Sequence, residues 1–136
     1  LPDAPVFSGH PSVAVLPFRH HGSGDHDLLA DGIVNELTTA LTRMRAFLVV
    51  SRQSAYIYKD RVADARTVGR ELGVAYIVDG SLQVVSSEIL VNVQLVETAD
   101  GKVIWSDRFR DSISDMFALQ ELIARKIAGA VHPSIR

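Results

Sequence analysis

Residues 64–85 constrain the fold of this chain more than any other stretch of its sequence. Asp64 is a suitable N-cap for a short helix, and Gly73 stands where a helix that ends in the left-handed conformation requires a glycine. Residues 74–78 are mostly β-branched or aromatic, and the run continues past Gly80 to Val85, as is typical of a strand. The stretch therefore predicts a helix, a glycine stop and a long strand. This pattern narrows the fold class, but it does not identify a chemical reaction.

The segments before this stretch predict strands that alternate with helices. Residues 12–18 form a short apolar strand that ends at Pro17, and a polar loop follows over residues 19–26. Residues 46–50 predict a second apolar strand, and residues 51–63 are either a loop or one short helical turn. Short connections between such elements favour right-handed crossovers and some parallel pairing.

Two long amphipathic helices are predicted from apolar residues at helical spacing. The first covers residues 27–44, and its buried face carries Leu28, Leu29, Ile33, Leu37, Ala40, Leu41 and Met44. The second begins at an N-cap Ser114 and ends near Val131, before the helix-breaking Pro133. Its buried stripe consists of Met116, Leu119, Ile123, Ile127 and Val131.

The second half of the chain predicts an antiparallel meander. Residues 88–98 alternate between apolar and polar side chains, and Asp100-Gly101 is typical of a tight hairpin turn. Residues 103–111 form the next strand, with Val103, Trp105 and Phe109 on one face. The predicted fold class is α/β with α+β character. Its mixed five-stranded sheet has the chain order β-α-β-α-β-β-β-α, and the last three strands are antiparallel.

The composition excludes several classes of protein. A chain of 136 residues fits one domain, and its formal net charge of −2 gives no electrostatic argument for nucleic-acid binding by this segment. The absence of cysteine excludes disulfides, thiol catalysis and thiolate metal sites. No stretch approaches the roughly 20 apolar residues of a membrane helix. We expect a linker over residues 1–11, one domain over residues 12–132 and the start of another linker over residues 133–136, in a module of a longer protein.

Six blocks of the sequence, in the same order, resemble a known bacterial module. They are PSVAVLPF, DLLADGIVNELTTAL, SRQSAYIYKDR, VGRELGVAYIVDGSLQ, VNVQLVETADGKVIWSDRF and DMFALQELIARKI, and the resemblance covers residues 11–132. The module is similar to the amino-terminal domain of TolB. It occurs in bacterial adenylate/guanylate cyclase-like proteins and in CadC-like winged-helix regulators that carry tetratricopeptide repeats. Two positions depart from the usual family pattern: RHHGSGDH replaces an Asn-rich loop, and Asp79-Gly80 replaces Glu-Gly.

The resemblance implies a regulatory role for this segment. The effector domains of such proteins make cyclic nucleotides or bind DNA, and this sequence matches neither a cyclase's metal-binding aspartates nor a winged helix. The family supplies no catalytic residue that could be assigned to a position of this chain. The implied role is to sense a ligand, or to support protein–protein contacts and oligomerisation.

The polar loop of residues 19–26 is a candidate metal or anion site. Residue types that suit zinc or nickel gather there, namely His20, His21, Asp25 and His26. Their spacing matches no standard metal site, so a solvated loop is the simpler interpretation. The N-terminus of the next helix would favour an anion, but Asp27 and Asp31, together with Asp25, already supply negative charge there. We therefore predict helix capping, with no metal and no cofactor.

Little in the sequence indicates an active site. Serine, histidine and aspartate are all present, but no Gly-x-Ser-x-Gly nucleophile elbow occurs. Asp79 and Glu97 interrupt the strand pattern, and we interpret them as exposed or paired charges rather than as an acid–base couple. Trp105 is interpreted as a core-packing residue rather than as a platform for a ligand. We expect this segment not to be an enzyme, although its parent protein could carry a cyclase domain.

Polar residues from three strands would share one face of the sheet if the strands pair in register. They are Asp79, Ser81, Gln83, Asn92, Gln94, Ser106, Arg108 and Arg110. This face is either the ordinary solvated side of an α/β domain or an interface for a partner domain or a second copy. The final strand is also a candidate open edge for β-augmentation. The candidate interaction residues are Gln83, Asn92, Gln94, Ser106, Arg108 and Arg110.

The sequence thus predicts a non-catalytic regulatory or interaction module of a larger bacterial signalling protein. The expected partner is another protein, a second copy of the chain or a small-molecule ligand. Nucleic-acid binding and membrane insertion by this segment are not expected. The alternative is a structural domain in cell-envelope assembly, as in TolB. The sequence leaves open whether the module lies on the cytoplasmic or the periplasmic side of a membrane.

Overall fold

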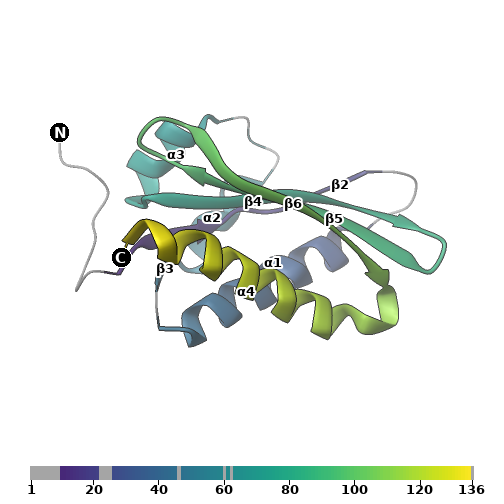
Figure 1. Ribbon diagram of the computed structural model, residues 1–136. Coiled ribbons are helices and arrows are strands. Elements are labelled where there is room, and N and C mark those ends of the chain that lie inside the picture. Colours follow the sequence, from purple (N-terminus) through teal and green to yellow (C-terminus); the bar gives the residue numbers. More distant parts are fainter. Residues whose placement is uncertain (1–9, 22–25, 46, 60, 62, 136) are drawn as a thin grey trace.

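A computed structural model describes residues 10–21, 26–45, 47–59, 61 and 63–135, and its strands form one mixed sheet (Figure 1). The sheet order is β3-β1-β4-β5-β6, and β2 pairs with β4 beyond the end of β1. The pairs β1–β3, β1–β4 and β2–β4 are parallel, whereas β4, β5 and β6 form an antiparallel meander. The strands are β1 (Ser12–Val15), β2 (Arg19–His21), β3 (Leu48–Val49), β4 (Tyr76–Val85), β5 (Glu88–Glu97) and β6 (Lys102–Ser112).

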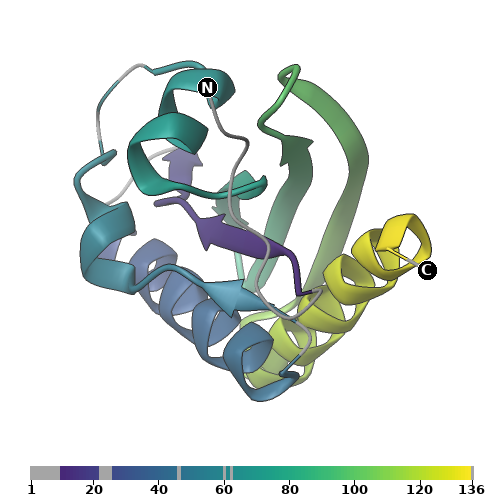
Figure 2. The ribbon, with the colours of Figure 1, turned by 90° about the vertical axis from the view of Figure 1, so that its left-hand side faces the viewer.

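Helices cover the two faces of this sheet unequally. The helices are α1 (Asp27–Arg43), α2 (Arg52–Tyr56), α3 (Ala65–Leu72) and α4 (Met116–Ile135), with a 3₁₀ turn at Ile113–Asp115. Figure 2 shows α1 and α4 side by side on one side of the sheet and α3 on the other. The mixed sheet and its final antiparallel strands confirm the predicted fold class.

The larger core lies between the sheet and the pair α1 and α4. It contains Val13 and Val78 from the parallel strands, Leu95 from β5, Leu37 from α1 and Ile123 from α4, all of them buried. A smaller cluster on the opposite face joins Ile77 and Val96 to Val68 of α3. No helix of the described residues is both long enough and apolar enough to cross a membrane.

The predicted helix and strand of residues 64–85 are confirmed, and β4 is the centre of the sheet. The side chain of Asp64 accepts a hydrogen bond from the Thr67 backbone N–H at 2.8 Å, which lowers the pKa of this carboxyl group. Gly73 ends α3 with φ of 70°, in the left-handed region. Ten residues of β4 pair with β5 along one edge, while β1 and β2 share its other edge. This strand therefore joins the parallel half of the sheet to the meander.

The first strand ends earlier than predicted, and part of the predicted loop is a strand. β1 stops at Val15, and Pro17, which has no backbone N–H to donate, separates it from β2. Arg19, His20 and His21, predicted as loop, pair with Ser81, Leu82 and Gln83 of β4. Residues 22–25 of the predicted loop lie outside the described residues. The loop prediction was wrong for β2 because the edge of β4 beyond β1 offers backbone partners that no local pattern reveals.

Two predicted elements differ in detail near the first crossover. Leu28 was assigned to the buried face of the first long helix, but it is 89% exposed, because the helical repeat places it on the side of α1 opposite the buried Leu37. The buried positions of α1 include Ile33, Leu37 and Leu41, as predicted. The second strand is Leu48–Val49, so Phe47 and Val50 of the predicted strand lie outside it, and Ala46 lies outside the described residues. Residues 51–63, left open between a loop and a helical turn, contain α2, capped by Ser51.

A β-bulge changes the face on which one predicted residue lies. Val103 pairs with Val96 and Trp105 pairs with Leu95, with Ile104 as the extra residue between them. Val96 and Leu95 are neighbours in β5 and so point to opposite faces. Val103 therefore does not share the face of Trp105 and Phe109, and it is 52% exposed. The prediction failed here because strict alternation does not account for an inserted residue.

The last helix begins and ends differently from the prediction. Ser112, not Ser114, acts as the cap: its side chain accepts a hydrogen bond from the Ser114 backbone N–H at the start of the 3₁₀ turn. α4 then runs from Met116 to Ile135, so Pro133 does not end it. The buried stripe of Leu119, Ile123, Ile127 and Val131 is confirmed, with Met116 partly buried against the same core.

Tyr58 belongs to the smaller cluster and links the segment after α2 to α3. The Tyr58 hydroxyl donates a hydrogen bond to Glu71 Oε1, and the Tyr58 ring is buried. Burial, this hydrogen bond and the negative charge of Glu71 raise the pKa of Tyr58 to about 12. The protonated phenol therefore favours the folded state at any pH below the unfolded value of about 10. This contribution is lost as the pH rises through about 12.

We expect Tyr58→Phe to remove the last phase of a spectrophotometric tyrosinate titration. In the wild-type protein Tyr58 stays protonated until the pH nears about 12, so its absorbance change comes late. The free energy of unfolding should also fall less steeply in the variant between about pH 10 and 12. A titration whose late phase is the same in both proteins would contradict the assignment.

Candidate interaction face

Among the described residues, the meander formed by β4, β5 and β6 is covered by helices mainly on one face. This face carries the buried residues Val91, Val93 and Leu95 beneath α1 and α4. On the opposite face α3 reaches only the start of β4, around Ile77 and Val96. Beyond this point the face is polar, and most of its side chains are exposed.

The observed register brings the eight polar residues together in cross-strand rows. Asp79 pairs with Gln94, which pairs with Ser106; Ser81 pairs with Asn92, which pairs with Arg108. In the third row Gln83 pairs with Leu90, and Leu90 pairs with Arg110. Directly paired residues point to the same face of a sheet. The structure thus places all of these residues, including the six candidate interaction residues, on one surface, which we call the polar face.

Strand β2 extends the polar face by a fourth strand. Because Arg19 pairs with Ser81, the middle row reads Arg19, Ser81, Asn92 and Arg108 across β2, β4, β5 and β6. Sequence reasoning missed Arg19, since residues 19–26 were predicted as a loop. No local signal marks this strand, because Arg19, His20 and His21 are all polar and three residues are too few to show a strand periodicity.

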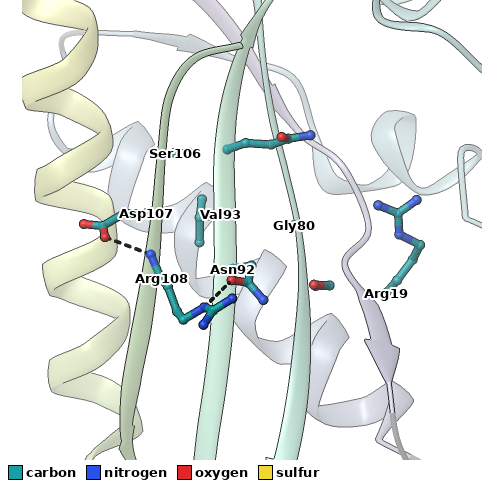
Figure 3. A pocket seen from close by; sticks show the side chains of 9 residues that line it. Arg19, Gly80, Asn92, Val93, Ser106, Asp107 and Arg108 are labelled. Carbon is teal, nitrogen blue, oxygen red and sulfur yellow. Dashed lines mark hydrogen bonds between the residues drawn. The ribbon is translucent and has the colours of Figure 1, made fainter.

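The middle of the polar face is hollowed. A depression of about 450 Å³ is lined by Arg19, Gly80, Ser81, Asn92, Val93, Gln94, Ser106, Asp107 and Arg108. Figure 3 shows Arg19 at one side of this depression and Arg108 at the other, with Asn92 between them. Asp107 points away from Asn92, toward the side of α4, and its carboxylate accepts a hydrogen bond from the Arg108 backbone N–H. The floor therefore offers hydroxyl and amide groups between two guanidinium groups.

The three arginines of the polar face have different partners. Arg110 donates from Nε and Nη2 to Glu88 Oε1, at 2.9 and 2.6 Å. Arg19 Nη2 lies 3.9 Å from Asp79 Oδ2, at the outer limit of an ion pair. Arg108 donates from Nε to the neutral amide oxygen of Asn92 at 3.1 Å. Within the part of the chain that the structure describes, Arg108 has no carboxylate partner for its side chain.

At the start of α1, the predicted helix capping was wrong, because the N-cap is His26 and no side chain caps the helix. The acidic side chains there instead contact cations of the protein itself. Asp27 Oδ1 lies 2.9 Å from His20 Nε2 and 3.6 Å from Lys59 Nζ, and Lys59 also lies 3.5 Å from Asp31. Burial lowers the pKa of Lys59, but its hydrogen bond to Tyr56 and the two carboxylates outweigh burial and raise it. The cluster therefore ties α1 to β2 and to the segment after α2.

The other candidate sites do not assemble in the described residues. Over residues 10–21, 26–45, 47–59, 61 and 63–135, no three His, Asp or Glu side chains are grouped so that they could hold a metal ion. Asp25 lies outside these residues. Asp79 pairs with Gln94, whereas Glu97 pairs with Tyr76, so the two carboxylates lie on opposite faces of β4 and β5. They cannot act as one acid–base couple.

Trp105 packs against the core and also borders an open edge. It is partly buried against the larger core. On its outer side, a shallow depression of about 520 Å³ is lined by Trp105, Leu122, Arg125, Lys126, Gly129 and Ala130. β6 is the terminal strand of the sheet at this edge, and Val103 and Ile104 beside Trp105 are 52% and 41% exposed. Since no other described strand pairs with β6 on this side, the edge combines unpaired backbone with exposed apolar side chains.

Solved structures share this fold at low sequence identity. TolB from Acinetobacter baumannii is 17% identical, with a TM-score of 0.68 over 90% of this chain and 28% of that chain. Lipoprotein GNA1162 from Neisseria meningitidis is 12% identical, with a TM-score of 0.66 over 87% of this chain and 96% of that chain. The LpoB C-terminal domain from Escherichia coli is 21% identical, with a TM-score of 0.60 over 75% of this chain and 82% of that chain. These likenesses show the fold alone.

Sequence comparisons are more specific. The chain is 34% identical over 128 residues to "Putative adenylate cyclase 3" of Rhizobium meliloti (strain 1021), covering 93% of this chain and 22% of that protein. The chain thus spans about a fifth of the length of this curated relative. Residues 8–126 match the model of the HilA/YgeH-like transcriptional regulator, second domain. Since this match covers most of the chain, the protein belongs to the family of HilA/YgeH-like transcriptional regulator second domains.

Proposed function

We propose that this chain is a non-catalytic regulatory module that acts through protein contacts within a larger bacterial signalling protein. The observation that carries the proposal is the open meander: β4, β5 and β6 have a polar face and a free edge that no other described element covers. Membership of a regulator-domain family and a relative named as a cyclase support a place beside an effector domain. The effector would be a cyclase or a DNA-binding domain, in a chain that also carries tetratricopeptide repeats.

The module would control its effector by favouring one of two arrangements. A partner domain or a small ligand bound to the polar face, or a second copy paired at β6, shifts the effector only through a difference in affinity between those arrangements. The two surfaces serve different contacts. Side chains dominate the polar face, whereas backbone hydrogen bonds dominate pairing at an edge strand.

We expect the chain to self-associate at micromolar concentration through the edge of β6. Ile104→Lys places a charge among the exposed apolar residues of this edge and should weaken the association, because charged edge residues oppose strand pairing. Sedimentation equilibrium from micromolar to near-millimolar concentration measures the change. Ile57→Lys is the matched control, since Ile57 is 56% exposed near the end of α2 and away from β6. A wild-type chain that stays monomeric throughout would exclude self-association as the mode of action.

The alternative function is a structural role in cell-envelope assembly. The observation that favours it is the shared fold with TolB, lipoprotein GNA1162 and LpoB. The full-length protein distinguishes the two functions. An effector domain before this module supports regulation, whereas a signal peptide and propeller blades after it support the envelope role.

A further inference from the structure

We infer that the polar face binds a carboxylate-rich, acidic segment of a partner protein, with Arg108 and Arg19 as the two anchoring residues. The inference rests on the proposed interaction role and narrows it to one chemical class of partner. Three observations carry it: the charge balance of the polar face, the geometry of its middle row and the depression between the two arginines.

The charge balance leaves the polar face one cation in excess. The face carries three arginines, Arg19, Arg108 and Arg110, and two carboxylates, Asp79 and Glu88. Glu88 Oε1 forms an ion pair with Arg110 Nη2 at 2.6 Å, and Asp79 Oδ2 lies 3.9 Å from Arg19 Nη2. Arg108 has only the neutral Asn92 oxygen as a side-chain partner among the described residues. An arginine held in place by an amide, with its outer N–H groups directed to solvent, is suited to a carboxylate.

Arg19 is able to join Arg108 in such a contact. Its distance to Asp79 is long for an ion pair, and its side chain is 72% exposed. Asp79 does not depend on Arg19, since its Oδ1 accepts a hydrogen bond from the Gly80 backbone N–H at 2.9 Å. A carboxylate that enters the depression can therefore bind Arg19, and Asp79 still keeps its hydrogen bond from the Gly80 backbone N–H.

The spacing of the two arginines fits an extended segment better than a single small anion. Arg19 and Arg108 end one row that crosses four strands, so their Cα atoms lie about 14 Å apart, which is three strand spacings of about 4.8 Å. In an extended peptide, side chains at positions i and i+4 point the same way and lie about 13 Å apart. Between the arginines, Ser81 and Asn92 offer hydrogen bonds to the backbone of such a segment.

A second copy of this chain does not fit the polar face as well. A symmetric dimer would bring the same face of both copies together. Each copy would bring one cation in excess, and neither face offers Arg108 a carboxylate that does not already lie beside Arg19 or Arg110. The occupant is therefore a different, acidic surface, and self-association is left to the edge of β6.

Titration of the chain with hexaglutamate, followed by backbone amide chemical shifts at low ionic strength, tests the inference. Hexaglutamine is the uncharged control peptide. We expect hexaglutamate to shift amides of the row from Arg19 to Arg108, and Arg108→Gln to weaken its binding by about three- to tenfold. Arg19→Gln should weaken it less, because Arg19 is shared with Asp79. Arg125→Gln, which removes the same charge from exposed α4, should leave the affinity unchanged.

Several outcomes would overturn the inference. If hexaglutamine binds as tightly as hexaglutamate, the site is not specific for acidic side chains. If Arg125→Gln weakens binding as much as Arg108→Gln, the charge effect is not localised on the polar face. Inorganic phosphate or glutarate binding as tightly as hexaglutamate, with the same loss in Arg108→Gln, identifies a small-anion site in place of a peptide site. If hexaglutamate fails while the chain still self-associates through β6, the interaction role stands and only the acidic partner is excluded.

Discussion

Replacing Ile123 by alanine is expected to lower the free energy of unfolding by about 2–5 kcal/mol. Ile123 is fully buried on α4, in the cluster that joins this helix to α1 and to the sheet. Removing three methyl or methylene groups loses their burial and leaves a cavity, because the flanking residues Leu119 and Ile127 are held on the same helix. Urea denaturation followed by the fluorescence of Trp105, the only tryptophan, measures the change.

The control for this substitution lies on the same helix. Phe117 is 78% exposed, so Phe117→Ala should change the free energy of unfolding by no more than about 0.5 kcal/mol. Equal losses in the two variants would mean that α4 does not pack on the sheet through Ile123. That result would also remove the reason why only one face of the meander is covered.

The second large effect is expected for Gly80→Ala, which should cost about 1–3 kcal/mol or more. A Cβ atom on Gly80 would lie 2.3 Å from the Asn92 backbone oxygen and 2.9 Å from two ring carbons of Phe18. The first contact is with backbone, so β4 and β5 would have to separate to relieve it. The strain falls beside Asn92, the residue that holds Arg108, so hexaglutamate binding should weaken as well.

Gly32→Ala is the matched control for this prediction. Gly32 lies inside α1, and a Cβ atom there would meet nothing within 4 Å. Alanine is a better helix former than glycine, so this variant should gain about 0.5–1 kcal/mol of stability. Thermal unfolding of the two variants should thus move in opposite directions. Destabilisation of both to the same extent would contradict the close approach at Gly80.

The resemblance and the comparisons agree on the type of module but not on every detail. The likeness to TolB, expected from six sequence blocks, appears as a shared fold, and a relative named as a cyclase matches most of the chain. The family assignment places the chain among regulator domains. The winged-helix and tetratricopeptide context remains part of the proposal. A regulator-domain family is also consistent with a segment that does no chemistry itself.

Most of the candidate site could be predicted from the sequence, because its residues follow strand alternation. Gln83, Asn92 and Arg108 occupy polar positions of long alternating strands. A tight turn between two strands also fixes the register in which they pair. The partner of each arginine could not be predicted. Whether Arg110 or Arg108 meets Glu88 depends on which residues face each other across β5 and β6, and a shift of two residues would exchange them.

The sequence by itself determined the elements whose signals are local. Asp64, Gly73 and the run to Val85 specify a capped helix, its stop and a long strand, because caps, left-handed glycines and β-branched runs act through neighbouring residues. Only the tertiary structure decided where β2 lies, which face Val103 occupies and that Arg108 has no carboxylate partner among the described residues. Each of these depends on backbone partners far along the chain. A short strand such as β2 forms its hydrogen bonds only when its neighbouring strand is present. The position of a bulge is likewise fixed by the register with the neighbouring strand.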